Sequence, residues 1–146
     1  MSVNVRLMTC TPEQVFAVLA DPWVYPTWVV GASRLRAADR RYPAEGSRLH
    51  HSVGVWPLVL NDETRVEVWD PPRRVVLEAK TRPFGTERVI IDVKPRRGGC
   101  IVRMEEYPYS GAVTRLPGLL ADSLLHVRNA EALRRLEWVA RGRAAA

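Results

Sequence analysis

Apolar and polar residues alternate along most of this chain, and the alternation gives way to a helical pattern in two regions. Residues 2–9 alternate, which predicts a strand with one solvated face. The period changes at Thr11 to Gln14, where a hydroxyl, a proline and a glutamine occupy the positions of a helix capping box. A short helix is therefore expected from there to about Ala20. A second short helix or turn, rich in aromatic residues and interrupted by Pro26, follows it.

The alternating pattern returns at about Ala32 and continues almost to the final segment. Turn residues divide it into short strands, and two of the expected turns are Asn61-Asp62 and Gly98-Gly99. Strands joined by such short connections are antiparallel, because a parallel crossover needs about a dozen residues or more. The predicted strands cover residues 33–38, 47–56, 64–69, 74–81, 87–94 and 100–107, with another turn at 83–85.

The longest helical pattern runs from Leu116 to Arg143. Its apolar residues fall on two neighbouring faces, so the apolar arc is wide and favours a concave partner over a flat one. One face holds Leu120, Leu124, Val127 and Trp138, and the other holds Leu125, Ala132, Leu136 and Val139. The order of elements predicts an α+β fold, with a curved antiparallel sheet of about seven strands wrapped around a long C-terminal helix and two short helices between the first two strands.

Length and composition add simple limits to this picture. A chain of 146 residues is expected to form a single domain, residues 1–146. No stretch approaches the roughly 18 apolar residues of a membrane span, and the N-terminus lacks the apolar run of a secretory signal, so a cytoplasmic location is expected. The two cysteines stand alone and predict neither a disulfide framework nor a metal site. Both a monomer and a homodimer remain open.

The net charge of +6 raises the question of an anionic partner. The basic residues are dispersed in pairs such as Arg40-Arg41 and Arg134-Arg135, however, and no run of five to eight gathers them. Only Lys80 and Lys94 are lysines, which is typical of a genome that favours arginine codons. This pattern does not favour nucleic-acid binding, and an anion-directed binder is the weakest hypothesis.

Strand alternation places two ionisable side chains, His51 and Glu106, among inward-facing apolar ones. In an apolar cavity they would orient a ligand or exchange protons with it, and burial is expected to raise the Glu pKa and lower the His pKa. The commoner alternative is a buried carboxylate satisfied by an arginine or by polar residues of the long helix. Asn129 and Glu131 of that helix are candidates to reach the cavity, with a solvated face as their alternative. Adjacent His50 and His51 point to opposite faces of a strand and predict no metal site.

The other candidate site residues line the same predicted cavity between sheet and helix. A closed interior without a cavity of about 300 Å³ would contradict this hypothesis. Ordinary core packing is the alternative for the aromatic members. No phosphate loop, nucleophile elbow or paired metal-ligand spacing occurs, so the conventional motif-bearing enzyme classes are not supported. The predicted ligand contacts are Tyr25, Trp28, Val53, Val55, Trp56, Val66, Val68, Leu77, Val89, Ile91, Met104, Leu120, Leu124 and Val127.

Three segments, together with the order of elements over residues 2–141, resemble a known family. They are CTPEQVFAVLADPWVYPTWV, VEVWDPPRRVVLEAK and GGCIVRMEEYPYSG. The chain resembles the polyketide cyclase/dehydrase branch of the SRPBCC superfamily, which includes START lipid-transfer and birch-pollen-allergen-type domains. This resemblance implies a helix-grip fold that holds a small hydrophobic molecule between the sheet and the C-terminal helix, without a cofactor.

The resemblance leaves two kinds of function open. Some members cyclise or dehydrate polyketides, with pocket Arg, Tyr, His or Ser side chains that orient the chain and assist proton transfer. Here the candidates compatible with inward placement are His51 and Glu106, with Tyr25 or Tyr107 at the rim. The implied mechanism is enolisation by a general base followed by loss of water. Other members are non-catalytic carriers of a lipid or metabolite, or self-protection proteins that sequester it.

Overall fold

The computed structural model describes residues 1–82, 85–111 and 118–146. The predicted turn residues 83–84 and the first two residues of the predicted final helix, 116–117, lie outside these ranges. The elements, in chain order, are β1 (Ser2–Met8), α1 (Pro12–Leu19), the 3₁₀ turn η1 (Pro22–Val24), α2 (Tyr25–Trp28), β2 (Ala32–Ala38), β3 (Arg48–Val55), β4 (Leu58–Asp70), β5 (Arg74–Thr81), β6 (Gly85–Arg96), β7 (Gly99–Ser110) and α3 (Gly118–Ala145).

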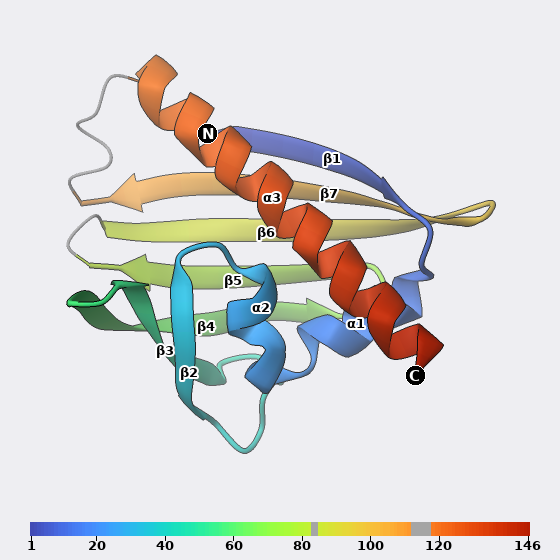
Figure 1. The fold of residues 1–146 in the computed structure, drawn as a ribbon, viewed down its shortest axis with the longest axis horizontal. Helices are drawn as coiled ribbons and strands as arrows, with labels where there is room; N and C mark the ends of the chain where they lie inside the picture. Colours follow the sequence, from blue (N-terminus) through green and yellow to red (C-terminus); the bar gives the residue numbers. More distant parts are fainter. Residues whose placement is uncertain (83–84, 112–117) are drawn as a thin grey trace.

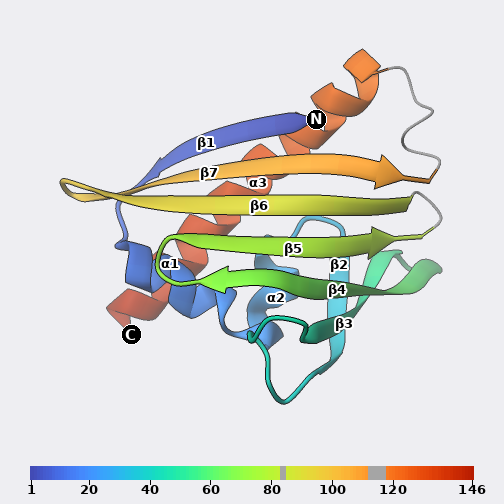
Figure 2. The ribbon, with the colours of Figure 1, turned by 180° about the vertical axis from the view of Figure 1, so that it is seen from behind.

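The seven strands form one sheet in the order β1-β7-β6-β5-β4-β3-β2, and every neighbouring pair is antiparallel. Figure 1 shows α3 running diagonally across one face of the sheet, with α1 and α2 on the same side. Seen from behind in Figure 2, the strands lie in front and the helices lie beyond them. The predicted α+β helix-grip architecture is confirmed.

The first helix begins where the capping pattern predicts. Thr11 Oγ1 accepts a hydrogen bond from the Gln14 backbone N–H at 3.2 Å, and the Thr11 backbone N–H donates to Gln14 Oε1 at 2.9 Å. This reciprocal pair satisfies two backbone donors that the helix leaves free. The helix buries Val15, Phe16 and Leu19 against the core, so α1 closes the end of the sheet beneath the second half of α3.

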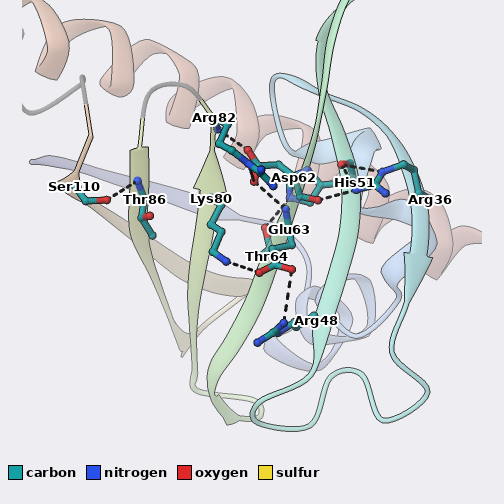
Figure 3. Close-up of polar contacts among 10 residues, drawn as sticks. All are labelled: Arg36, Arg48, His51, Asp62, Glu63, Thr64, Lys80, Arg82, Thr86 and Ser110. Atoms are coloured by element: carbon teal, nitrogen blue, oxygen red, sulfur yellow. Dashed lines mark hydrogen bonds and ion pairs between the residues drawn. The ribbon is translucent and has the colours of Figure 1, made fainter.

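The β3–β4 hairpin differs from the prediction. The chain turns at residues 56–57, and Asn61 and Asp62 lie within β4, opposite Ser52 and His51. Their side chains are satisfied there: Ser52 Oγ donates to Asn61 Oδ1 at 3.1 Å, and Asp62 accepts from the Arg82 backbone N–H at 2.5 Å (Figure 3). A predicted turn at these residues is therefore wrong, because partners in the sheet replace the local bonds that make Asn and Asp turn formers.

The same hairpin exposes two predicted cavity residues. Val55 and Trp56 are 81% and 85% exposed. They stand at the tip, where the chain reverses direction and strand alternation no longer applies. The prediction that they face inward is wrong.

The long helix α3 buries one of the two predicted apolar faces. Leu125, Ala132 and Leu136 are at most 7% exposed, as predicted. The other face is solvated: Leu120, Leu124, Val127 and Trp138 are 66%, 70%, 69% and 55% exposed. The prediction that the whole wide apolar arc packs against a concave partner is wrong, because the buried stripe includes Asn129 and Glu137 and leaves the second apolar face in solvent.

Candidate functional site

A cavity of about 360 Å³ lies between the first half of α3, the segment after α2 and the inner faces of β3 to β7. It exceeds the roughly 300 Å³ that a small-molecule site requires. Ten of the candidate residues line it: Tyr25, Trp28, His51, Val53, Leu77, Val89, Met104, Glu106, Leu124 and Asn129. The lining residues that were not predicted are mainly small or apolar, but they include the polar Thr64, Glu87 and Arg128.

The remaining predicted contacts do not line this cavity. Val66 and Ile91 are 1% and 0% exposed and belong to the hydrophobic core that α1 and the second half of α3 cover. Val68 is half-buried, one position past an irregularity in the β4–β5 register. Leu120 and Val127 lie on the solvated face of α3. Val55 and Trp56 are exposed at the tip of the β3–β4 hairpin.

Two carboxyl groups meet at the cavity wall. Glu87 on β6 and Glu106 on β7 are 4% and 0% exposed. Arg128 of α3 bridges them, since its Nη2 donates to Glu87 Oε2 at 3.3 Å and also to Glu106 Oε1. Asn129 Nδ2 donates to Glu106 Oε2 at 2.6 Å. Both oxygens of Glu106 are thus occupied, so this carboxylate has the partners that the alternative interpretation required, an arginine and a polar residue of the long helix.

The two carboxyl groups differ in acidity. Burial, and then the hydrogen bond and charge of Glu106, raise the pKa of Glu87 to about 8. Burial acts in the same direction on Glu106, but its bonds with Glu87, Arg128 and Asn129 outweigh this effect and lower its pKa. At neutral pH the pair therefore holds one proton, on Glu87, and with Arg128 the cluster has no net charge. The predicted rise in the pKa of Glu106 is therefore wrong, because these bonds outweigh burial, and Glu87 is the carboxyl group whose pKa is raised.

Glu87 and Arg128 are functional candidates that the sequence analysis missed. The signal for Glu87 was present, because it shares the strand parity of the inward-facing Val89 and Ile91. Arg128 stands three residues after Leu125 and four before Ala132, on the buried stripe of α3. Its charge argued for a solvated position, and the two carboxyl groups opposite explain why the side chain is half-buried.

A second polar group stands on β3, β4 and α2. His51 Nε2 and Thr64 Oγ1 are 2.9 Å apart, and the same Thr64 oxygen is 2.9 Å from the Tyr25 hydroxyl (Figure 3 for His51 and Thr64). The His51 and Tyr25 rings pack with their centroids 5.1 Å apart. Burial lowers the pKa of His51 to about 4, which confirms the predicted direction. His51 is consequently neutral at pH 7 and is a weak base.

Other features of the described chain bear on the class of site. Glu131 does not reach the cavity; it pairs with Arg134 and Arg135 on the surface of α3. Across residues 1–82, 85–111 and 118–146, no three or more His, Cys, Asp or Glu side chains are grouped so that they could hold a metal ion. None of the helices in these ranges is long and apolar enough to cross a membrane.

Comparison with known proteins gives a family match and several structural matches. Residues 2–141 match the model of a family described as polyketide cyclase/dehydrase and lipid transport. Among curated proteins, none matches the sequence.

The structural matches have low sequence identity. A protein from Nitrosomonas europaea is 15% identical, with a TM-score of 0.76 over 99% of this chain and 96% of its own. One from Rhodobacter sphaeroides is 23% identical, with a TM-score of 0.73 over 96% of this chain and 91% of its own. The two-domain ARO/CYC StfQ of the steffimycin biosynthetic pathway is 14% identical, with a TM-score of 0.72 over 99% of this chain and 51% of its own. At these identities the likeness establishes the fold alone.

Proposed function

Because this chain belongs to the polyketide cyclase/dehydrase and lipid-transport family, we propose that it binds a small hydrophobic or aromatic metabolite between the sheet and α3. One observation carries this proposal: the cavity of about 360 Å³ has largely apolar walls with polar groups at two places, Glu87–Glu106–Arg128 and His51–Thr64. Apolar walls with a few fixed polar groups are typical of small-molecule sites, where the polar groups orient the ligand.

The size of the cavity favours a compact ligand. Its volume is near the lower end of the range of about 300–1,000 Å³ found for ligand pockets. Trp28 and Tyr25 supply flat apolar surfaces on one side, and Leu77, Val89 and Met104 supply aliphatic surface on the sheet. We therefore expect a ligand of fused rings to fit better than a long extended chain.

Two substitutions on the same helix test where the ligand lies. Ala121 lines the cavity, whereas Ala130 is exposed on α3. Ala121→Trp puts an indole into the ligand's space and is expected to weaken binding of α-tetralone, an aromatic ketone, by at least about tenfold. Ala130→Trp has the same helix propensity and is expected to leave binding unchanged. Isothermal titration calorimetry measures both, and equal affinities in the two variants would contradict the proposed site.

A second candidate function, dehydration or cyclisation chemistry, is favoured by the proton held on Glu87. A buried carboxyl group that stays protonated at neutral pH is suited to general acid catalysis. Glu87 would donate its proton to a β-hydroxyl group that leaves as water, and the resulting carboxylate would accept the proton from the adjacent carbon. Glu106 holds Arg128 in place and does not itself take the proton, because both of its oxygens already accept hydrogen bonds.

The alternative is a carrier or sequestering protein with the same pocket and no reaction. The β-hydroxy ketone 3-hydroxy-α-tetralone separates the two, because its loss of water gives the fluorescent 1-naphthol. If Glu87 catalyses dehydration, the wild-type protein accelerates this reaction and Glu87→Gln abolishes the acceleration while it still binds α-tetralone. His51→Ala and Glu106→Gln test the two residues that the sequence singled out. Binding without acceleration by the wild-type protein favours the carrier.

A further inference from the structure

One buried side-chain atom among the described residues has no hydrogen-bond partner: Nδ1 of His51. His51 is 2% exposed and lines the cavity. Buried polar atoms in proteins are almost always paired, and an unpaired one costs stability. An unpaired nitrogen on a cavity-lining ring therefore points to a partner that the ligand supplies.

The hydrogen bonds on the other side of the ring determine whether this nitrogen is a donor or an acceptor. Thr64 Oγ1 lies 2.9 Å from both His51 Nε2 and the Tyr25 hydroxyl, and Thr64 and Tyr25 are 1% and 5% exposed. In one arrangement Tyr25 donates to Thr64 and Thr64 donates to Nε2, so both hydroxyl protons are used. Nε2 is then the acceptor, and a neutral ring carries its proton on Nδ1.

The opposite arrangement is less favourable. If Nε2–H donates to Thr64, the hydroxyl proton of either Thr64 or Tyr25 has no acceptor among the hydrogen bonds of the described residues. Two buried groups would then be unsatisfied instead of one. The ring is neutral at pH 7, because burial lowers the pKa of His51 to about 4, so only one of its nitrogens holds a proton.

We propose that the Nδ1–H of His51 donates a hydrogen bond to a carbonyl oxygen of the ligand, and that the ligand is a compact uncharged ring ketone or quinone. This inference rests on the proposed function and adds the chemical class of the ligand to it. An uncharged ligand fits because the Glu87–Glu106–Arg128 cluster carries no net charge at neutral pH. A carbonyl fits better than a hydroxyl, because a ligand hydroxyl would bring a further proton, and both oxygens of Glu106, which also lines the cavity, are already occupied.

In this arrangement His51 determines ligand specificity, and Thr64 and Tyr25 are positioning residues. The Thr64 hydroxyl accepts a hydrogen bond from Tyr25 and donates one to His51 Nε2. This bond holds the His51 ring in place and fixes its tautomer. Thr64→Val keeps the side-chain shape but removes the hydroxyl. It is expected to leave a mixture of both tautomers and to reduce the preference for a carbonyl ligand.

Three ligands with one bicyclic skeleton test the proposal: α-tetralone has a carbonyl, tetralin has no polar atom and 5,6,7,8-tetrahydro-1-naphthol has a hydroxyl. By calorimetry, the wild-type protein is expected to bind α-tetralone about tenfold more tightly than tetralin, with the phenol between them. His51→Asn, whose amide nitrogen takes the place of Nδ1, is expected to keep this preference. His51→Gln, whose amide takes the place of Nε2, and His51→Phe are expected to lose it. Unchanged tetralin affinity in each variant shows that the pocket is intact.

The tautomer is measured without a ligand. A long-range ¹H–¹⁵N NMR correlation of the wild-type protein at neutral pH is expected to place the proton on Nδ1, and a proton on Nε2 overturns the inference. Equal affinities of the wild-type protein for α-tetralone and tetralin also overturn it but leave the proposed function standing. If none of the three ligands binds, the proposed function fails, and this inference fails with it.

Discussion

The proton on Glu87 makes a quantitative prediction for the variant Glu87→Gln. Glutamine has the shape of a protonated glutamate, so it can still accept from Arg128 and donate to Glu106. Unlike glutamate it does not titrate. The variant therefore removes the cost of ionising this position and preserves the contacts of the protonated form.

The sign and size of the effect follow from the shift in pKa from the ordinary value of 4.5 to about 8. Between these values the folded protein binds more protons at this position than the unfolded chain does, so the wild-type stability falls as the pH rises. The slope approaches about 1.4 kcal/mol per pH unit within the window. From about pH 5.5 to 7.5, the stability of Glu87→Gln relative to wild type is therefore expected to rise by about 2–3 kcal/mol.

Urea denaturation followed by tryptophan fluorescence at several pH values measures this difference. Glu13→Gln, at an exposed carboxyl group in the first turn of α1, serves as the matched control for the change from a carboxyl group to an amide. The lowered pKa of Glu106 acts in another window, below its ordinary value, and does not interfere. A relative stability of Glu87→Gln that stays constant between about pH 5.5 and 7.5 would refute the assignment of the proton to Glu87.

Three further substitutions test other parts of the account. Glu106→Gln replaces the buried carboxylate that accepts from Arg128 and Asn129 and is expected to lower the unfolding free energy by about 1–3 kcal/mol, measured in urea. Leu124→Trp, at an exposed position on the cavity rim, is expected to change stability by about 0.5 kcal/mol or less yet weaken α-tetralone binding; a large fall in melting temperature would place Leu124 in the core. Glu137→Gln is expected to destabilise the protein by about 1–3 kcal/mol at pH 7, since Glu137 accepts from Arg6 and from the Thr9 backbone. Because these bonds lower the pKa of Glu137, this difference should shrink as the pH falls below the ordinary Glu value; a constant difference down to about pH 3 would contradict it.

Much of the fold could be predicted because local patterns carry it. The capping residues Thr11 and Gln14 form the bonds that their spacing predicts, and strand β5 has the predicted bounds, Arg74–Thr81. Strand alternation also assigned the inward face correctly for His51 and Glu106. In these places local propensity and tertiary packing agree.

The prediction failed where distant partners override the local signal. Asn61 and Asp62 look like a turn, but bonds from Ser52 and the Arg82 backbone hold them inside β4. The predicted apolar residues of α3 fall on two faces, and the pattern within the helix does not tell which face is buried. The contacts of polar residues in the buried stripe decide this. Glu137 in that stripe binds Arg6 and Thr9 on the first segment of the chain, a contact that no pattern within the helix reveals.

The candidate site was only half predictable for the same reason. His51 and Glu106 could be found because each interrupts an apolar row of one strand. Arg128 turns toward the cavity because Glu87 and Glu106 lie opposite it on two strands, and the acidity of each carboxyl group depends on the other. Such coupling exists only in three dimensions.

The central claim is that a small molecule occupies the cavity between the sheet and α3. Native mass spectrometry of the purified protein incubated with α-tetralone tests it most directly, with Ala121→Trp and Ala130→Trp measured beside the wild type. We predict that the wild type and Ala130→Trp each bind one molecule of α-tetralone and that Ala121→Trp binds none. Of the two alanines, Ala121 lines the cavity and Ala130 is exposed on α3. Equal retention of the ligand by Ala121→Trp, or no bound ligand in the wild type, would contradict the claim.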